Sequence, residues 1–389
     1  MNPSSGLALL ILVGVGLHGL WRFRSTLSAW KNPAGVLMAF GMAWAVISIL
    51  WSVTAAGSVR DVLKSIPMAM AALGIPSLVN RPGRIWLGLL ASASWVTLCL
   101  TMDLVRLFVW LGWPWVMPAA RFVHPYLYTH PNVSSMMAGL CAMVFAARWL
   151  AGAPGRGRKA WLAAGLALNF AFLVVMGSRG PQVALAVITL SLPVALIPGW
   201  RARLVVAGLA VLIGIGLWQV AHKINPRFKD NTMHNFNSRD RIWGHVAMLI
   251  RERPLGYGFG KRAFIQAVYH HPEHLPLRGP AKYNHAHSYW LMLGFEGGWI
   301  AMGLWGLAWM LLARRLAVWA ARATGPPGNG MERIKARTAP ILLLGGLMFI
   351  LFYGIVDFPD HAIRHAQFYL TGLAMALTAL PATGGQEAG

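Results

Sequence analysis

Eleven apolar runs, each close to twenty residues long, follow one another along almost the whole chain. About 20 apolar residues in a helix cross the ~30 Å hydrocarbon core of a bilayer. One such run could be a buried helix of a soluble domain, but soluble domains carry about 25% charged residues and this chain carries 12%. We therefore predict an all-α integral membrane protein with about 11 or 12 transmembrane helices. The runs lie near 6–21, 33–51, 62–79, 84–102, 132–150, 160–177, 181–198, 203–221, 287–312, 339–357 and 365–381.

Three other features concern the number of spans, the start of the chain and the two cysteines. The stretch 104–118 is apolar but short and contains prolines, so it is either a twelfth membrane element or an interfacial helix. The first run has no basic residues before it and no clear small-residue cleavage site after it, which argues against a signal peptide. Cys99 and Cys141 both fall inside predicted spans, so we expect packing roles rather than a disulfide or zinc site.

The basic residues are distributed unevenly along the chain. The formal charge of +23 would suggest a nucleic-acid partner in a soluble protein. Half of the 34 lysines and arginines, however, lie in five short loops that alternate along the chain, as cytoplasmic loops of membrane proteins do. We therefore place these loops in the cytoplasm and expect no nucleic-acid partner. The residues are Arg22, Arg24, Lys31, Arg81, Arg84, Arg148, Arg156, Arg158, Lys159, Arg201, Arg203, Arg314, Arg315, Arg322, Arg333, Lys335 and Arg337.

One long polar segment, 222–286, then lies on the outer side and divides the chain. Membrane helices precede it at 1–221 and follow it at 287–389. The segment holds 11 basic residues against four acidic ones, and the bias of cytoplasmic loops does not explain this excess. It is either a solvated loop near anionic headgroups or a site for an anionic substrate. The side on which the amino terminus lies depends on whether there are 11 or 12 spans.

Residues 238–253 within this segment are predicted to form a helix. Ser238 suits the N-cap, apolar residues recur at helical spacing, and Pro254 ends the pattern. Its amphipathic character suits a helix along the outer surface. Arg239 and Arg241 lie in the first turn beside free backbone N–H groups, so they form either a phosphate-binding site or an exposed charged helix end.

Two shorter motifs are less specific. The sequence PLGYGFG at 254–260 permits a tight turn or the close approach of a ligand, and no βαβ unit surrounds it to suggest dinucleotide binding. Arg179, in GSRG at the outer end of a predicted span, could bind an anion or extend to the lipid headgroups.

Two histidines, His285 and His287, end the polar segment at a membrane boundary. A neutral imidazole can accept a proton near pH 7, so either is a candidate catalytic base. With His270, His271 and His274 they could suggest a metal site. Their spacing fits no strong zinc pattern, few acids are near, and the positive surroundings repel a dication.

Four motifs, in this order, resemble the O-antigen ligase family and its wider ligase/polymerase superfamily. The resemblance covers about residues 165–300, and the arrangement of spans extends it to most of the chain. Members often have asparagine where this chain has Ser288. The motifs are SRG at 178–180, Arg239 four residues before Trp243, PLGYGFG at 254–260, and His287–Ser288 followed by Glu296 and a glycine-rich helix.

The resemblance implies a glycosyltransferase of the GT-C type that uses no cofactor, metal or nucleotide sugar. Such an enzyme moves a glycan from undecaprenyl diphosphate to an acceptor at the periplasmic face of the bacterial inner membrane. In the ligases the acceptor is the lipid A–core oligosaccharide, as part of lipopolysaccharide biosynthesis. By position, His287 matches the essential histidine, and Arg179 and Arg239 match the arginines that hold the diphosphate. Arg241 and His285 join them by proximity in the sequence.

Three alternatives remain. An O-antigen polymerase or a protein O-oligosaccharyltransferase would use the same chemistry on another acceptor. A transporter of anionic lipids belongs to a different class and should show charged groups at mid-membrane depth, often with broken helices. Here most charges lie at span boundaries, with Asp103, Arg106 and Glu296 the few near span interiors. This pattern favours an enzyme.

The topology makes a prediction for chemical labelling. Single cysteines between 262 and 284, in a background lacking Cys99 and Cys141, should react with an impermeant thiol reagent added from the periplasmic side. Cysteines between 322 and 333 should not, because the positive-inside rule places that loop in the cytoplasm. If only the second set reacts, the topology is inverted and the proposed site lies on the wrong face.

Overall fold

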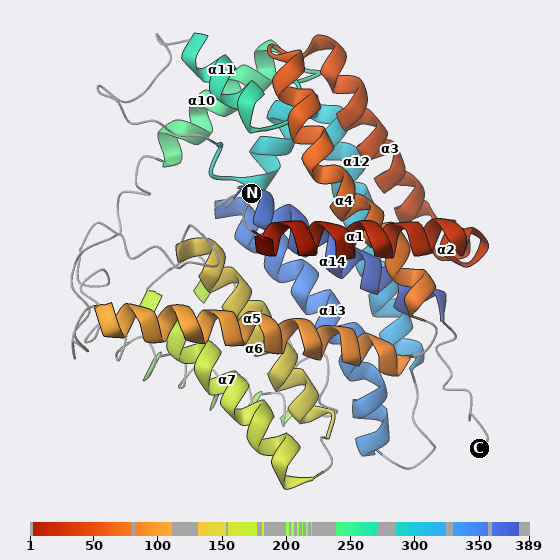
Figure 1. Ribbon diagram of the computed structural model, residues 1–389, viewed down its shortest axis with the longest axis vertical. Helices are drawn as coiled ribbons and strands as arrows, with labels where there is room; N and C mark the ends of the chain where they lie inside the picture. The colour runs from red at the N-terminus through yellow and green to blue at the C-terminus, as the bar shows by residue number, and fades with distance from the viewer. Residues whose placement is uncertain are drawn as a thin grey trace. The chain divides into compact units, whose positions relative to one another are not determined.

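The computed structural model describes residues 3–79, 82–110, 131–152, 155–176, 239–270, 285–323, 330–356 and 360–380, with scattered helical residues between 181 and 219. Throughout these residues the regular structure is helical and there is no strand (Figure 1). Six helices in this part of the chain are long and apolar enough to cross a membrane. The protein is thus an all-α membrane protein, as predicted.

The helices follow the predicted apolar runs closely. Nine of the eleven runs coincide with helices, and the other two, 181–198 and 203–221, lie largely outside the described residues. The apolar stretch 104–118 begins as the end of α5, and the remainder lies outside the described part. The helices are α1 (Pro3–Trp21), α2 (Phe23–Trp30), α3 (Pro33–Ile47), the 3-10 turn η1 (Ser48–Trp51), α4 (Ala55–Leu78), α5 (Pro82–Trp110), α6 (Pro131–Leu150), α7 (Arg156–Met176), α10 (Arg239–Glu252), α11 (Lys261–His270), α12 (Tyr289–Arg322), α13 (Gly330–Val356) and α14 (Asp360–Ala379).

These helices form two compact units. The first contains residues 1–80, 235–315 and 350–380, and the second contains 81–234, 316–349 and 381–389. In the second unit, α6 packs on α7, where Gly165 leaves room for the Phe145 ring. Asn169 of α7 donates to the Thr97 hydroxyl of α5 at 2.8 Å. Small residues and cross-helix hydrogen bonds of this kind hold membrane helices together.

In the first unit, α1 and α14 both pack on α4. Glycines on α1 and α4 allow this approach, since a Cβ on Gly19 would lie 2.5 Å from the Cα of Gly74. Local signals set the helix starts nearby. The Asn32 side chain accepts from the Gly35 N–H at 3.2 Å before α3, and Thr54 accepts from the Gly57 N–H at 3.3 Å before α4.

Helix α10 confirms the helix predicted at 238–253, but its apolar face is not available to lipid. Ile242, Val246, Leu249 and Ile250 are all buried in the protein. The apolar face of α10 therefore packs inside the protein, and the position of this helix along the outer surface stays a prediction. Near the end of α10, Ile250 meets α12, since a Cβ on Gly294 would lie 2.8 Å from its Cδ1, and the neighbouring α11 packs on α4 (Figure 1).

Helix α12 is interrupted after Glu296. The backbone leaves the helical conformation at Gly297 (φ −136°, ψ 18°) and Gly298 (φ 67°, ψ −161°). The second pair of angles is accessible essentially to glycine alone. The interruption removes the hydrogen bonds that would normally join the turns on either side, so their polar groups need other partners.

The loop of residues 254–260, here called the glycine loop, supplies those partners. Its Tyr257 N–H donates to the Phe295 carbonyl at 2.7 Å, and its Gly258 N–H donates to the Glu296 carbonyl at 3.2 Å. In return, the Trp299 N–H donates to the Pro254 carbonyl at 3.1 Å. The loop therefore satisfies the backbone of α12 on both sides of the interruption.

Three glycines let the loop come this close. Gly256, Gly258 and Gly260 have φ values of 84°, 101° and 102°. A Cβ on Gly256 would lie 2.7 Å from the Glu296 carbonyl carbon. At Gly258 and Gly260 a Cβ would instead meet the side chains of Ser52 and Asp61. The three glycines are thus needed for close packing against the rest of the protein, rather than for a turn alone.

Residues of the segment before α4 also donate hydrogen bonds to this region. Trp44 of α3 donates from Nε1 to the Gly297 carbonyl at 2.8 Å. Trp51 donates from Nε1 to the Leu255 carbonyl at 3.1 Å, and the Val53 N–H donates to the Tyr257 carbonyl at 3.1 Å. Three segments far apart in sequence therefore meet at the interruption of α12.

This arrangement predicts that Gly298→Ala destabilises the protein strongly. Its Cβ would collide with the Pro254 carbonyl oxygen, and the ε-region backbone conformation costs a non-glycine residue about 1–3 kcal/mol. The unfolding temperature in detergent should fall accordingly. Gly303→Ala is the matched control, because Gly303 lies in the same helix and its Cβ would have nothing within 4 Å. Equal unfolding temperatures for the two variants would contradict the role assigned to Gly298.

Candidate functional site

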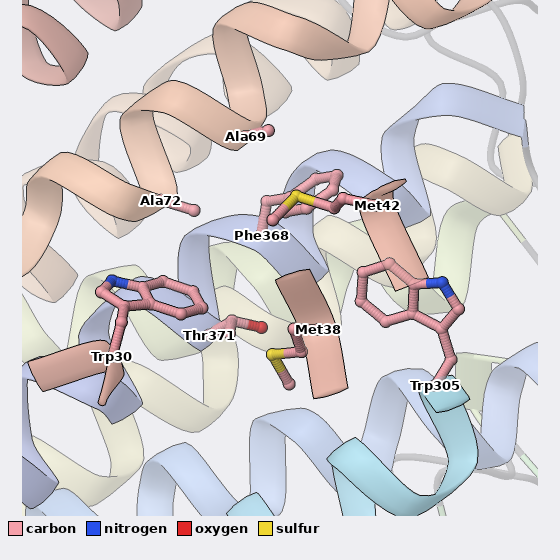
Figure 2. Close-up of a pocket in the computed structure, with 8 residues that line it drawn as sticks. All are labelled: Trp30, Met38, Met42, Ala69, Ala72, Trp305, Phe368 and Thr371. Atoms are coloured by element: carbon pink, nitrogen blue, oxygen red, sulfur yellow. The ribbon is translucent and has the colours of Figure 1, made fainter. Parts of the chain in front are cut away.

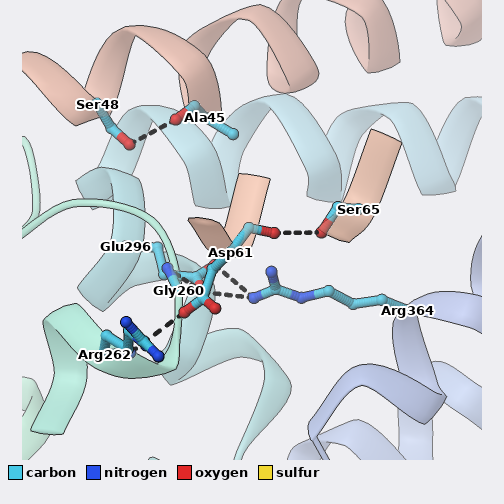
Figure 3. Close-up of polar contacts among 8 residues, drawn as sticks. All are labelled: Ala45, Ser48, Asp61, Ser65, Gly260, Arg262, Glu296 and Arg364. Atoms are coloured by element: carbon cyan, nitrogen blue, oxygen red, sulfur yellow. Dashed lines mark hydrogen bonds and ion pairs between the residues drawn. The ribbon is translucent and has the colours of Figure 1, made fainter. Parts of the chain in front are cut away.

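A buried carboxylate lies at the point where α12 is interrupted. Glu296 is 3% exposed, and Nη2 of Arg364, from α14, donates to both of its oxygens at 2.5 and 2.6 Å. The Gly260 N–H donates to Oε1 at 3.0 Å (Figure 3). A carboxylate in the interior requires such partners, because burying an unpaired charge is costly.

A second buried acid, Asp61 of α4, lies next to this pair (Figure 3). It is 2% exposed, and its Oδ2 accepts from the Arg262 N–H at 3.3 Å. A Cβ on Gly260 would lie 2.5 Å from the same oxygen. Glu296, Arg364, Gly260 and Asp61 are called the Glu296 cluster below. The cluster joins α4, the glycine loop, α12 and α14.

Aromatic contacts complete the packing of the glycine loop. The Tyr257 ring stacks on Phe295 with centroids 5.0 Å apart, and the Arg364 guanidinium lies 4.5 Å from the Phe259 ring centroid. Burial, reinforced by the neighbouring Glu252 carboxylate, raises the pKa of Tyr257 to about 12. The phenol therefore stays protonated and donates to Glu252 at 3.2 Å.

The two predicted catalytic histidines lie together at the start of α12. The centroids of the His285 and His287 rings are 4.2 Å apart. His287 has φ 48°, a left-handed conformation that few non-glycine residues adopt. Trp243 of α10 donates from Nε1 to the His287 carbonyl at 3.2 Å. The backbone of His287 is thus held by a neighbouring helix in a strained conformation, a combination that clusters at functional sites.

Ser288 provides the first turn of α12 with a cap. Its hydroxyl accepts from the Leu291 N–H at 3.4 Å, and its carbonyl accepts from the Met292 N–H at 2.9 Å. An asparagine side chain can make the same capping bond. Ser288 therefore caps the helix that follows His287, as an asparagine at this position would.

The structure describes only part of the predicted anion site. Arg239 is the first residue of α10, one turn before Trp243, so the helix that holds His287 also carries Arg239. Arg241 lies in the same turn, but its side chain is outside the described part. Arg179 also lies outside it. The common placement of the three arginines therefore stays a prediction.

A metal centre and an apolar cavity are the other two kinds of site to consider in the described residues. In the described residues, no group of three or more His, Cys, Asp or Glu side chains is arranged to hold a metal ion. An apolar pocket does occur among α2, α3, α4, α12 and α14 (Figure 2). Its lining is apolar apart from Thr371, so it offers little for a reacting polar group. The lining residues are Trp30, Met38, Met42, Ala69, Ala72, Trp305, Phe368 and Thr371.

The fold and the site together describe an all-helical membrane protein with histidines and buried charges gathered at an interrupted helix. Residues 164–306 match the family described as O-antigen ligase. The match covers somewhat more than a third of the chain and confirms the resemblance inferred from the motifs. The matched segment contains Arg179, Arg239, the glycine loop, His287 and Glu296. A search of curated proteins with this chain gave no match.

Sequence reasoning missed the roles of Asp61 and Arg364. A signal was present, because Glu296 is a lone acid within an apolar run and a buried acid needs a cationic partner. Arg364 begins the last predicted span on the same predicted side of the membrane. The Glu296–Arg364 pair could have been proposed from these observations. The position of Asp61 of α4 beside the pair depends on tertiary packing, which the sequence pattern does not show.

The Glu296 cluster predicts a characteristic double-mutant result. Glu296→Gln should destabilise the protein by about 3–5 kcal/mol, because it leaves the Arg364 charge buried without its counter-ion. Adding Arg364→Met should restore much of the loss, since replacing both charges by groups of similar volume is often neutral. Chemical or thermal unfolding in detergent measures both effects.

Glu252→Gln serves as the control for this cycle. Glu252 is exposed and accepts from Tyr257, so its replacement should change stability little. The single variant Arg364→Met completes the cycle. If the double variant lost as much stability as Glu296→Gln and Arg364→Met lose together, Glu296 and Arg364 would not be energetically coupled.

Proposed function

We propose that this protein is an O-antigen ligase that transfers a glycan from undecaprenyl diphosphate to the lipid A–core oligosaccharide. The family of residues 164–306 supports a function of the O-antigen ligase/polymerase type. The membrane-spanning helices support a lipid-linked substrate. Location in the bacterial inner membrane, with the site facing the periplasm, is part of the proposal and follows from the distribution of basic loops.

The observation that carries the proposal is the position of His287. Its strained backbone is held by Trp243 at the start of α12, beside His285 and next to the helix that begins with Arg239. In the proposed reaction, His287 Nε2 or Nδ1 accepts the proton of the acceptor hydroxyl as that oxygen attacks the anomeric carbon. General-base catalysis of this kind contributes typically ~10²–10⁴-fold in rate. His285 positions the ring of His287 or contacts the acceptor.

The arginines would act on the leaving group. The bond from the anomeric carbon to undecaprenyl diphosphate breaks as the new glycosidic bond forms, and negative charge develops on the departing diphosphate. Arg179, Arg239 and Arg241 are proposed to stabilise that charge, which fixed cations do well in a site with little water. A single direct displacement inverts the anomeric configuration. Neither a metal ion nor another cofactor takes part.

A transporter of anionic lipids is the candidate from another class, and one observation bears on it directly. Broken membrane helices with buried charges are typical of transporters, whose unwound carbonyls bind ions, and α12 is interrupted beside buried Glu296. Here, however, the glycine loop occupies the backbone groups at the interruption, and Arg364 and Gly260 occupy the carboxylate. Because these groups are already used within the protein, the geometry favours an enzyme.

The polymerase and the protein O-oligosaccharyltransferase share the proposed donor and chemistry. They differ in the acceptor, which must therefore be varied in the test. Purified protein is incubated with lipid-linked glycan, excess EDTA and, in separate reactions, lipid A–core, a second lipid-linked glycan or an acceptor protein. Transfer to lipid A–core alone supports the ligase. Transfer only to another acceptor, or a need for added magnesium or manganese, would overturn the corresponding part of the proposal.

Within this assay, His287→Ala should abolish transfer while the protein keeps its unfolding temperature and still binds the lipid-linked donor. His285→Ala should cause a smaller loss, because that ring is proposed to position rather than to accept the proton. His18→Ala is the matched control, since His18 lies in α1 and bonds to Ser77, outside the proposed site. Near-normal turnover by His287→Ala would rule out its role as the base.

A further inference from the structure

Three cations gather where α11 meets the start of α4. Arg60 and Lys64 lie one turn apart on α4, and Arg262 lies in the first turn of α11. The Arg262 side chain runs along α4, since its Cβ and Cδ are 2.9 and 3.2 Å from the position that a Cβ on Gly57 would take. All three side chains are exposed. They are called the α4–α11 cations below.

The buried acid beside them, Asp61, offsets one of the three positive charges and leaves a net positive surface. Asp61 is 2% exposed, and its Oδ2 accepts from the Arg262 backbone N–H at 3.3 Å (Figure 3). Its Oδ1 is 3.8 Å from the Lys64 Nζ, which is longer than a direct hydrogen bond. Asp61 therefore fixes α11 against α4, while the cationic groups of Arg60, Lys64 and Arg262 remain at the surface.

Neither helix stability nor topology accounts for this arrangement. Like charges one turn apart weaken a helix, and Arg60 and Lys64 are such a pair. The positive-inside rule concerns the opposite side of the membrane, because the loop after α4, with Arg81 and Arg84, is the one predicted to be cytoplasmic. A binding role explains the α4–α11 cations, which neither helix stability nor membrane topology explains.

The neighbouring surface is apolar. Val59, Leu63 and Ile66 recur at helical spacing on α4 and are 41%, 59% and 41% exposed. An amphiphile that combines hydrocarbon with phosphate complements such a surface, because its chains can lie along these residues while its phosphates meet the cations. Arginine offers a planar fork to phosphate oxygens, and lysine offers a mobile point charge.

We infer that the α4–α11 cations bind the phosphate groups on the lipid anchor of the acceptor. This inference rests on the proposed function, in which the acceptor is a phosphorylated glycolipid. The donor diphosphate is assigned to Arg239 on α10, whereas Arg60, Lys64 and Arg262 lie on α4 and α11. The two lipids therefore approach the protein along different helices, and the anchor phosphates act by holding the acceptor rather than by taking part in the chemistry.

The test compares acceptors with and without anchor phosphates. Initial rates are measured with lipid A–core and with the same acceptor after removal of its phosphates, for the whole chain and for the R60Q/K64Q/R262Q variant. With the phosphorylated acceptor, the variant should show an acceptor KM raised roughly tenfold or more and an unchanged kcat, since each cation near a membrane surface contributes several-fold to binding an anionic lipid. With the dephosphorylated acceptor, both proteins should show the same high KM.

The R156Q/R158Q/K159Q variant is the matched control. It removes three exposed cations from the start of α7 and should leave the acceptor KM unchanged. If the α4–α11 variant raised KM equally for both acceptors, or raised it for neither, the inference would be wrong. If the control variant showed the same rise, the effect would come from net charge and the assigned surface would be wrong.

A binding measurement separates failure of this inference from failure of the proposed function. Protein in nanodiscs is titrated with labelled lipid A, with phosphatidylglycerol as the competitor and phosphatidylcholine as the neutral lipid. Preferential lipid A binding that is lost in R60Q/K64Q/R262Q supports the surface even if no transfer is found. Equal competition by phosphatidylglycerol would show a surface for bulk anionic lipid and overturn the assignment to the acceptor.

Discussion

The hydrogen bonds between the glycine loop and the interrupted α12 are the constraint on which the described site depends. A helix cannot leave its regular course within a membrane protein unless the freed backbone groups find partners. Here residues 254–260 supply them, and Trp44 and Trp51 supply two more bonds to the same region. The interruption is consequently a fixed feature that holds α3, α4, α10 and the start of α12 in one arrangement.

The electrostatic arrangement follows from this geometry. The first part of α12 ends at Glu296. The Glu296 carboxylate therefore lies beside the Gly260 N–H and Arg364, and both donate to it. The short helical stretch from Tyr289 to Glu296 is then fixed at both ends, by the Glu296 cluster at one end and by Trp243 and Ser288 at the other. His287 immediately precedes that stretch. Such a fixed position suits the role proposed for His287, because a base for a displacement reaction must be held in place and small errors in position reduce rates sharply.

The sequence predicts much of this architecture and less of the site. Apolar runs predicted the helices because about 20 apolar residues in a row have few alternatives to a membrane span. The motifs predicted the family segment and placed His285 and His287 together.

The glycines at 254–260 could not be interpreted fully, since a glycine pattern does not reveal whether a ligand or the protein itself comes close to them. The parts played by Asp61 and Arg364 depend on contacts across more than 200 and more than 60 residues of sequence, respectively, which local patterns do not encode. For the same reason, periodicity predicted that α10 is an amphipathic helix, but it did not show that its apolar face packs inside the protein.

We propose that His287 and Arg239 belong to one site for a lipid-linked diphosphate. An experimental structure of the protein bound to an undecaprenyl diphosphate-linked glycan tests it most directly. We expect the diphosphate within direct hydrogen-bond distance of the Arg239 guanidinium, about 2.7–2.9 Å, and the His287 ring facing the anomeric carbon. Diphosphate density on the α4–α11 cations, or at any place from which His287 does not reach the anomeric carbon, would contradict the claim.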